Sequence, residues 1–126
     1  MPVKVVDASA VSALLFGEPK AARVAEAAQG FRLAVPTLLD YEVSSVCLKK
    51  IRLHPEHRGA LLSAYRLLPR LPVDRYRVEA EATIQLAEET GLSVYDACYL
   101  WLARNLRAEL MTLDRRLASV AKRIFR

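Results

Sequence analysis

The chain opens on Pro2-Val3-Lys4-Val5-Val6-Asp7, a short β-branched stretch that ends in a carboxylate. Residues 3–6 are mostly β-branched and sharply bounded, which is typical of a buried strand. Similar segments return at residues 33–35 and 109–113, with helix-like segments between them. Strands that alternate with helices predict a mostly parallel central sheet covered by helices on both faces. The expected fold class is α/β, with about four or five strands.

Seven helices are expected from apolar spacing, capping residues and helix breakers. Thr37-Leu38-Leu39-Asp40 and Ser93-Val94-Tyr95-Asp96 both have the pattern of a capping box, which opens a helix. A brief strand is expected at residues 71–73, and Ile124-Phe125 is either an edge strand or a frayed end. The expected helices span residues 8–16, 19–30, 37–53, 55–68, 75–90, 93–107 and 115–122.

Length and composition favour one globular domain over residues 1–126. The 126 residues are enough to bury about two-thirds of the unfolded surface, and 53% of them are hydrophobic. The longest apolar run, residues 97–103, is far too short to cross a bilayer. Because the chain runs straight into a strand without a secretory leader, we expect a cytoplasmic protein with no membrane partner. Cys47 and Cys98 fall in apolar helical stretches, where a thiol is usually a small core residue.

Four carboxylates fall where such a fold brings distant segments together. Asp7 and Asp114 follow the first and the last long strand, and Glu42 and Asp96 lie early in helices that follow loops. Ligands of open α/β folds bind beyond the carboxyl ends of the strands, so we expect the four acids to share one rim. Two carboxylates ~4 Å apart repel by roughly 4 kcal/mol at an effective dielectric near 20, a large share of the ~5–15 kcal/mol that stabilises a domain. Such a cluster needs a cation.

The donor atoms near these acids favour a hard divalent ion. Ser9, two residues after Asp7, is placed to hold a metal-bound water or to hydrogen-bond that carboxylate, and Thr112 precedes the last acid by two residues. Oxygen-only ligands point to Mg²⁺ or Mn²⁺. The two histidines, His54 and His57, lie far from the acids along the chain, which leaves no zinc site and no Ser-His-Asp set. Net charge of +5 with acids gathered at one point suggests metal-assisted chemistry on a polyanion.

Each acid also has an ordinary structural explanation. Asp7 and Asp114 are good N-caps for the helices that follow them, and Asp96 occupies the acidic position of a capping box. Glu42 borders the apolar arc of its helix, where a carboxylate costs several kcal/mol unless it is paired or ligates a metal. Its alternative is an edge position, in solvent or beside a basic partner, Lys49 or Arg23. The joint pattern of four acids is stronger than any one of them.

Four stretches of the chain resemble the acidic segments of PIN-domain ribonucleases. Residues 5–9 (VVDAS) resemble the opening strand with its acid, and residues 35–43 (VPTLLDYEV) resemble the second segment, with Glu42 as its acid. Residues 92–100 (LSVYDACYL) and 111–117 (MTLDRRL) resemble the third and fourth. Order and spacing match over essentially the whole chain, and the likeness is greatest to the VapC-type toxins of type II toxin–antitoxin systems. Ser45 departs from the pattern, because many relatives carry Asn there.

The resemblance implies a single PIN-like domain that is a metal-dependent endoribonuclease and the toxin of a toxin–antitoxin pair. Asp7, Glu42, Asp96 and Asp114 would be catalytic and would hold Mg²⁺ or Mn²⁺, Glu42 directly or through water, with Ser9 and Thr112 in support. The implied products carry a 5′-phosphate and a 3′-hydroxyl. The implied partners are an RNA substrate, an antitoxin protein that blocks the groove, and a second copy in a homodimer. Candidates for phosphate contact are Arg115, Arg116, Lys49 and Lys50.

Two other functions are compatible with parts of the same pattern. An aspartyl phosphotransfer or phosphatase domain would use Asp7 as a nucleophile on a similar sheet. A receiver-type domain would need an acidic pair at the first strand, however, and Val6 and Ala8 flank Asp7 instead. A dehalogenase-like site would need an acid two residues after the first, where Ser9 stands. The second alternative is a non-catalytic RNA- or protein-binding module with the same fold, which the presence of all four acids disfavours.

Overall fold

The structure of the protein is a computed structural model that describes residues 1–125. These residues form a single-domain α/β fold. Two short 3₁₀ turns, Pro55–His57 and Leu68–Arg70, flank α4. Along the chain the strands and α-helices are β1 Val3–Val6, α1 Ala8–Leu15, α2 Ala21–Ala28, β2 Arg32–Pro36, α3 Leu39–Leu53, α4 Arg58–Tyr65, β3 Val73–Tyr76, α5 Ala80–Thr90, α6 Val94–Leu106, β4 Glu109–Met111 and α7 Arg115–Ile124.

The described strands form one four-stranded sheet with the order β3-β2-β1-β4. Every pairing is parallel, and in the register of the sheet Val5 lies between Ala34 of β2 and Leu110 of β4. The predicted parallel sheet is therefore confirmed. All four carboxyl ends reach the same edge, and the chain leaves β1 and β4 in opposite directions, to α1 and to α7. This divergence is the usual position of a ligand site in an open α/β sheet.

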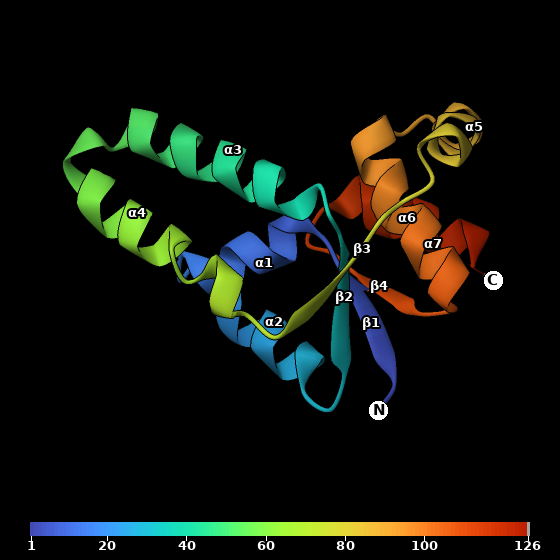
Figure 1. Cartoon of the computed structure of the whole chain (residues 1–126), viewed down its shortest axis with the longest axis horizontal. Coiled ribbons are helices and arrows are strands. Elements are labelled where there is room, and N and C mark those ends of the chain that lie inside the picture. Colours follow the sequence, from blue (N-terminus) through green and yellow to red (C-terminus); the bar gives the residue numbers. More distant parts are fainter. Residues whose placement is uncertain (126) are drawn as a thin grey trace.

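Helices cover both faces of the sheet (Figure 1). On one face α1 and α2 pack against the strands through apolar side chains such as Val11 and Val24. On the other face α6 contacts β1, β2 and β4, and α7 contacts β4. Tyr99 and Leu102 of α6 are almost completely buried in the main core, and Leu100 is buried in a second cluster with α5 and α7. Because α6 is apolar nearly all round, it belongs to both cores.

Several expected boundaries are wrong, each for a local reason. The capping box at Thr37 does not form, because the N-cap of α3 is Leu38, which makes no side-chain cap bond, and the helix begins at Leu39. The strand expected at residues 71–73 lies at 73–76, since its residues pair with β2, and α5 accordingly starts at Ala80 rather than at residue 75. Residues 19–30 contain only the shorter helix α2. Ile124 ends α7 and forms no strand, and the helix expected at residues 55–68 is a 3₁₀ turn followed by α4.

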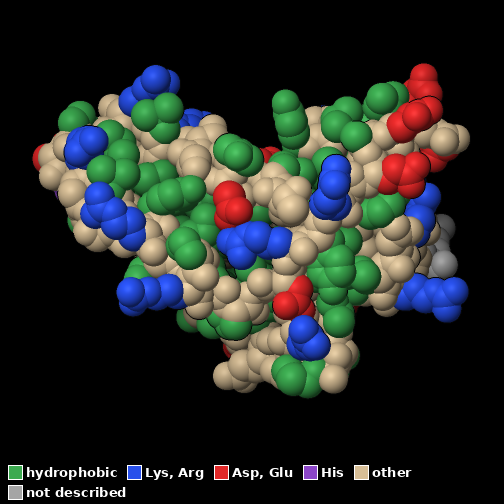
Figure 2. Space-filling model, viewed as in Figure 1, with side chains coloured by type: hydrophobic (Ala, Val, Ile, Leu, Met, Phe, Trp, Pro, Cys, Tyr) green, Lys and Arg blue, Asp and Glu red, His purple; other side chains and the backbone are tan. Residues whose placement is uncertain are grey.

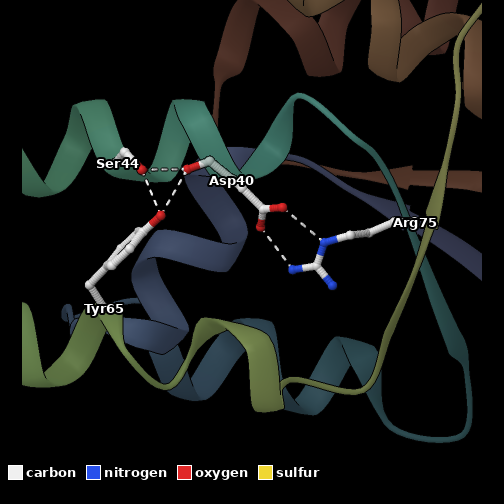
Figure 3. Close-up of polar contacts among 4 residues, drawn as sticks. All are labelled: Asp40, Ser44, Tyr65 and Arg75. Atoms are coloured by element: carbon white, nitrogen blue, oxygen red, sulfur yellow. Dashed lines mark hydrogen bonds and ion pairs between the residues drawn. The ribbon is translucent and has the colours of Figure 1, made fainter.

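A polar network ties the start of α3 to α4 and β3 (Figure 3). The Arg75 guanidinium donates to both oxygens of Asp40, at 2.8 and 3.1 Å. Ser44 Oγ donates to the Asp40 backbone carbonyl at 2.7 Å, and the Tyr65 hydroxyl lies 2.6 Å from Ser44 Oγ. These four residues are called the Asp40 network below. Asp40 is thus a structural residue, as its place in the helix suggested, although its partner is Arg75 rather than a cap.

Charge is unevenly distributed over the surface (Figure 2). Lys and Arg side chains gather over the end of the molecule formed by α3 and α4, and Asp and Glu side chains gather at the α5 end. Cys47 and Cys98 are buried and free, in agreement with their expected role as core residues. Over residues 1–125, the helices are too short or too polar for any of them to cross a membrane.

Candidate active site

Four helix N-termini meet at the carboxyl edge of the sheet, and each carries one of the predicted acids. Asp7 is the N-cap of α1 and Asp114 is the N-cap of α7. Glu42 lies in the first turn of α3, and Asp96 lies in the first turn of α6. The four are called the acidic rim below. Helix N-termini carry partial positive charge, so these starts reduce the cost of holding four carboxylates at one edge.

Asp7 is the most enclosed member of the acidic rim, with 5% of the residue exposed. Its Oδ1 accepts from Ser9 Oγ at 2.6 Å and from the Ala10 amide at 3.1 Å, and its Oδ2 accepts from Thr112 Oγ1 at 2.5 Å. The sequence predicted the bond from Ser9 but placed Thr112 beside Asp114. In the structure the Thr112 hydroxyl donates to Asp7 and accepts from the Asp114 amide at 3.0 Å. Burial raises the pKa of Asp7, these hydrogen bonds oppose the rise, and the charge of Asp114 adds to it.

Glu42 turns toward α6 and meets Tyr99 rather than a cation. The Tyr99 hydroxyl donates to Glu42 Oε1 at 2.5 Å. Neither Lys49 nor Arg23, the partners considered from the sequence, takes this place. Burial raises the pKa of Glu42, the bond from Tyr99 lowers it, and the charges of Asp96 and Asp7 raise it further. Burial and the adjacent carboxylate also raise the pKa of the Tyr99 hydroxyl, so it stays protonated as the donor.

Asp96 and Asp114 serve as parts of helix starts and still face the other acids. The Ser93 hydroxyl accepts from the Asp96 amide at 3.1 Å, which confirms Ser93 as the N-cap of α6. Asp114 Oδ1 accepts from the Leu117 amide at 3.0 Å. Burial raises the pKa of Asp96, as do the charges of Asp114 and Asp7, whereas Arg116 lowers it. Capping and membership of the acidic rim are therefore compatible.

The chemistry of the acidic rim fits a hard divalent cation in donor type and in charge. Its donors are carboxylate oxygens with hydroxyls beside them, which suit Mg²⁺ or Mn²⁺. The charges of neighbouring members raise the pKa values of Asp7, Glu42 and Asp96, so negative charge there lacks full compensation. In their present orientations, however, no three His, Cys, Asp or Glu side chains among residues 1–125 are grouped closely enough to hold an ion. Binding of an ion would therefore require these side chains to move closer together.

The four basic residues predicted to contact phosphate differ in their surroundings. Arg116 is near enough to lower the pKa of Asp96, and its guanidinium donates to the Gly91 carbonyl at 2.6 Å. Lys50 instead pairs with Glu18 at 3.1 Å. Lys49 and Arg115 are exposed on α3 and α7. Among these four candidates, Arg116 is therefore the one whose charge acts on a member of the acidic rim.

The sequence did not single out two features of this region. Tyr99 was missed as the partner of Glu42, although it lies three residues after Asp96, on the same side of one helix. An open groove of about 550 Å³ also runs beside Glu42. Tyr41 and Tyr95 line it from α3 and α6. Tyr95 is 64% exposed, so its ring does not pack in the core.

Comparisons with known proteins identify relatives over almost the whole chain. The sequence model of the PIN domain family matches residues 4–123. A ribonuclease VapC3 from Pyrobaculum aerophilum is 34% identical over 119 residues, which cover 90% of this chain and 91% of the relative. A ribonuclease VapC9 from Mycobacterium tuberculosis is 35% identical over 121 residues, covering 94% and 91%. A protein named exonuclease VapC9 from P. aerophilum is 32% identical over 130 residues, covering 97% and 89%.

A solved structure confirms the fold independently. The crystal structure of PAE2754 from P. aerophilum superposes with a TM-score of 0.75 over 98% of this chain and 93% of that one. Its sequence identity is 24%, so this comparison speaks for the architecture alone.

Proposed function

Because this chain is a member of the PIN-domain family, we propose that it is a Mg²⁺- or Mn²⁺-dependent endoribonuclease that serves as the toxin of a toxin–antitoxin pair. Support comes from relatives named VapC ribonucleases, which are similar over most of their length. The observation that carries the proposal is the acidic rim, which holds Asp7 at 5% exposure without a cation among its hydrogen-bond partners. The repulsion and burial of these carboxylates would be offset if they bound a metal ion.

The proposed ligands are Asp7, Asp96 and Asp114, with Glu42 bound directly or through water. A divalent ion held there would lower the pKa of a bound water and stabilise negative charge on the phosphate. Ser9 and Thr112 fix both oxygens of Asp7, so this carboxylate keeps one orientation. Tyr99 fixes Oε1 of Glu42, so Oε2 is left to accept the proton of the attacking water. As the family resemblance implies, the water would attack phosphorus, the P–O3′ bond would break and O3′ would take up a proton, which leaves a 5′-phosphate and a 3′-hydroxyl.

The test is cleavage of RNA by the purified protein. We expect cutting with Mg²⁺ or Mn²⁺, no cutting with excess chelator, and recovery when the ion is restored. Asp96→Asn is the matched control, because it removes one charge while keeping the shape of the side chain. Equal cutting by the wild type and by this variant would contradict the proposed site. Phosphorylation of Asp7 by a small phosphodonor, without RNA cleavage, would instead favour an aspartyl phosphotransfer domain.

The endonucleolytic step needs its own experiment, because one relative is named an exonuclease. A circular RNA has no ends, so only an endonuclease converts it to a linear product. We expect linear RNA from the circle at a rate close to that for the linear strand of the same sequence. A circle that stays intact while the linear strand is degraded from one end would replace endonuclease with exonuclease.

The remaining parts of the proposal concern partners and location. We propose that residues 1–126 form one functional domain in the cytoplasm, that a small antitoxin protein inhibits it, and that two copies form a homodimer. A small reading frame next to this gene, whose product suppresses both RNA cleavage and growth arrest, would support the antitoxin. Light scattering of the purified protein measures the oligomeric state directly. Arg115, Arg116 and Lys49 remain candidates for phosphate contact, and Lys50 is the weakest of the four because Glu18 holds it.

A further inference from the structure

We infer that Tyr41 and Tyr95 stack on unpaired RNA bases next to the scissile phosphate and so position the strand for cleavage. This inference rests on the proposed nuclease function and names two residues that hold its substrate. The two rings line one groove of about 550 Å³ together with Glu42, within the roughly 300–1,000 Å³ of ordinary ligand pockets. The other lining residues are Ala8, Leu38, Ser45 and Val46.

The exposure of the two rings sets them apart from the other tyrosines. The chain has five tyrosines, and Tyr41 and Tyr95 are the two that are exposed, at 81% and 64%. Each directly precedes a member of the acidic rim, Glu42 or Asp96. A large aromatic ring held in water gains nothing from the fold, whereas an amphipathic ring is well suited to a binding surface. Their common place beside the proposed reacting centre suggests a shared ligand.

Bases are the part of an RNA strand that such rings would recognise. Stacking on aromatic side chains is the usual way in which proteins hold unpaired bases, and it requires bases that are free of a duplex. Because Glu42 lines the groove, a base held there adjoins the phosphate that the acidic rim would cut. Two rings on different helices, α3 and α6, provide two separate stacking surfaces.

The helix that carries Tyr41 also provides cations for the backbone of the strand. Ser45 and Lys49 follow Tyr41 at intervals of four residues, so they lie on the same side of α3, and all three are exposed. Lys49 is about 12 Å from Tyr41 along the helix axis, at 1.5 Å per residue. Lys and Arg side chains gather over this end of the molecule (Figure 2). Aromatic rings near the reacting centre with cations beyond them are the pattern of single-strand binding grooves.

The experiment measures binding in an Asp7→Asn background, which leaves the strand intact whether or not the wild type cuts it. The probe is an unstructured oligoribonucleotide of about 12 nucleotides that contains the fluorescent base 2-aminopurine. Its emission falls when the base stacks. The comparison probe is the same strand paired with its complement. Added substitutions are Tyr41→Leu and Tyr95→Leu, with Tyr41→Phe and Tyr95→Phe as ring-preserving controls. Ile84→Ala, at an exposed apolar residue of α5 outside the groove, controls for general surface effects.

We expect each leucine variant to bind the single strand about 5- to 100-fold more weakly and to lose the fall in emission. The phenylalanine variants and Ile84→Ala should bind as the background protein does, and the duplex should be insensitive to all of these changes. Leucine variants that match the phenylalanine variants would overturn the inference and leave the groove to a protein partner. Equal effects on strand and duplex would overturn it as well.

The outcome separates this inference from the proposed nuclease. Tyrosine-dependent binding of the single strand by a protein that never cuts RNA would support the inference and contradict the nuclease. If the protein cuts RNA in a metal-dependent way and the leucine variants retain the wild-type KM, the nuclease would be supported and the inference contradicted. If both hold, the leucine variants should raise KM for single-stranded RNA with little change in kcat, because the reacting groups are untouched.

Discussion

The acidic rim and the Asp40 network both place carboxylates at the start of α3, but they treat negative charge in opposite ways. Asp40 and Glu42 are two residues apart in the first turn of this helix. Asp40 is 38% exposed in its side chain and receives both donors of the Arg75 fork. Glu42 is half-buried and receives only a tyrosine hydroxyl. Asp7, across the rim, is almost completely buried among hydroxyls and one backbone amide.

This difference distinguishes a structural carboxylate from a functional one. A carboxylate that only stabilises the fold gains most from a bidentate cation and retained contact with water, as Asp40 has. Buried carboxylates without a counter-ion reduce stability, and burial accordingly raises the pKa values of Asp7, Glu42 and Asp96. Such a cost is the usual mark of a site that binds a cation or carries out a reaction.

The largest expected difference between the two regions is in RNA cleavage. Asp7→Asn should lower the cleavage rate by more than about 100-fold, because even the residues that support a metal ligand are worth about 10–100-fold. Asp40→Asn should change the rate little, since Asp40 contacts Arg75 rather than the reacting groups. Initial rates at saturating Mg²⁺ measure both. If Asp40→Asn lost as much cleavage activity as Asp7→Asn, the distinction between a structural Asp40 and a functional Asp7 would be wrong.

Tyr99→Phe sharpens the comparison within the acidic rim. It removes the hydroxyl that orients Glu42 and leaves the buried ring in place. We expect cleavage to fall by about 10-fold and the acidic limb of its pH profile to move to higher pH, since the bond from Tyr99 lowers the pKa of Glu42. Rates from about pH 5 to 9 would show both effects. An unchanged pH profile would mean that Glu42 takes no proton in the reaction.

In the Asp40 network the expected effects are on stability. Arg75→Gln should lower the free energy of unfolding by about 1 kcal/mol, because the pair is bidentate but about one-third exposed. Urea unfolding measures this change. In a double-mutant cycle with Asp40→Asn the two losses should not add, since each variant breaks the same pair. Fully additive losses would show that the pair contributes nothing by itself.

In metal-free protein, neutralising a carboxylate of the acidic rim should raise the free energy of unfolding. This effect is opposite in sign to that of Arg75→Gln and smaller. The pKa values of Asp7, Glu42 and Asp96 are raised in the folded state, so the folded chain binds protons more tightly than the unfolded chain does. Stability should therefore increase as the pH falls from neutral, and level off near the ordinary values of 3.8 for Asp and 4.5 for Glu. Asp96→Asn should be slightly more stable than the wild type at pH 7 and less sensitive to pH. Saturating Mg²⁺ should reverse the slope, because the ion binds the deprotonated acids.

Much of the site could be predicted from the sequence because its parts are local. Asp7, Asp96 and Asp114 stand at helix starts that single-residue signals mark, and the parallel sheet brings β1 and β4 to one edge. Ser9 lies within two residues of Asp7, so its hydrogen bond was within reach of sequence reasoning.

The parts that were missed depend on contacts between distant segments. Tyr99 and Glu42 are separated by 57 positions along the chain, and Arg75 and Asp40 by 35. Arg75 was expected inside a helix, but it lies in β3, which pairs with β2. From this strand its guanidinium reaches Asp40 of α3. The failed capping box at Thr37 has the same origin, because tertiary contacts at this end of α3 outweigh a weak local preference.

The most direct test of the account is the effect of Mn²⁺ on Tm in the wild type, Asp7→Asn and Asp40→Asn. An ion that binds only the folded state raises Tm, and the rise grows with the ratio of the ion concentration to its Kd. If the buried charge of the acidic rim exists to hold a divalent cation, Mn²⁺ will raise Tm of the wild type and of Asp40→Asn by the same amount and leave Asp7→Asn nearly unchanged. Equal shifts in all three proteins, or no shift in the wild type at saturating Mn²⁺, would contradict it.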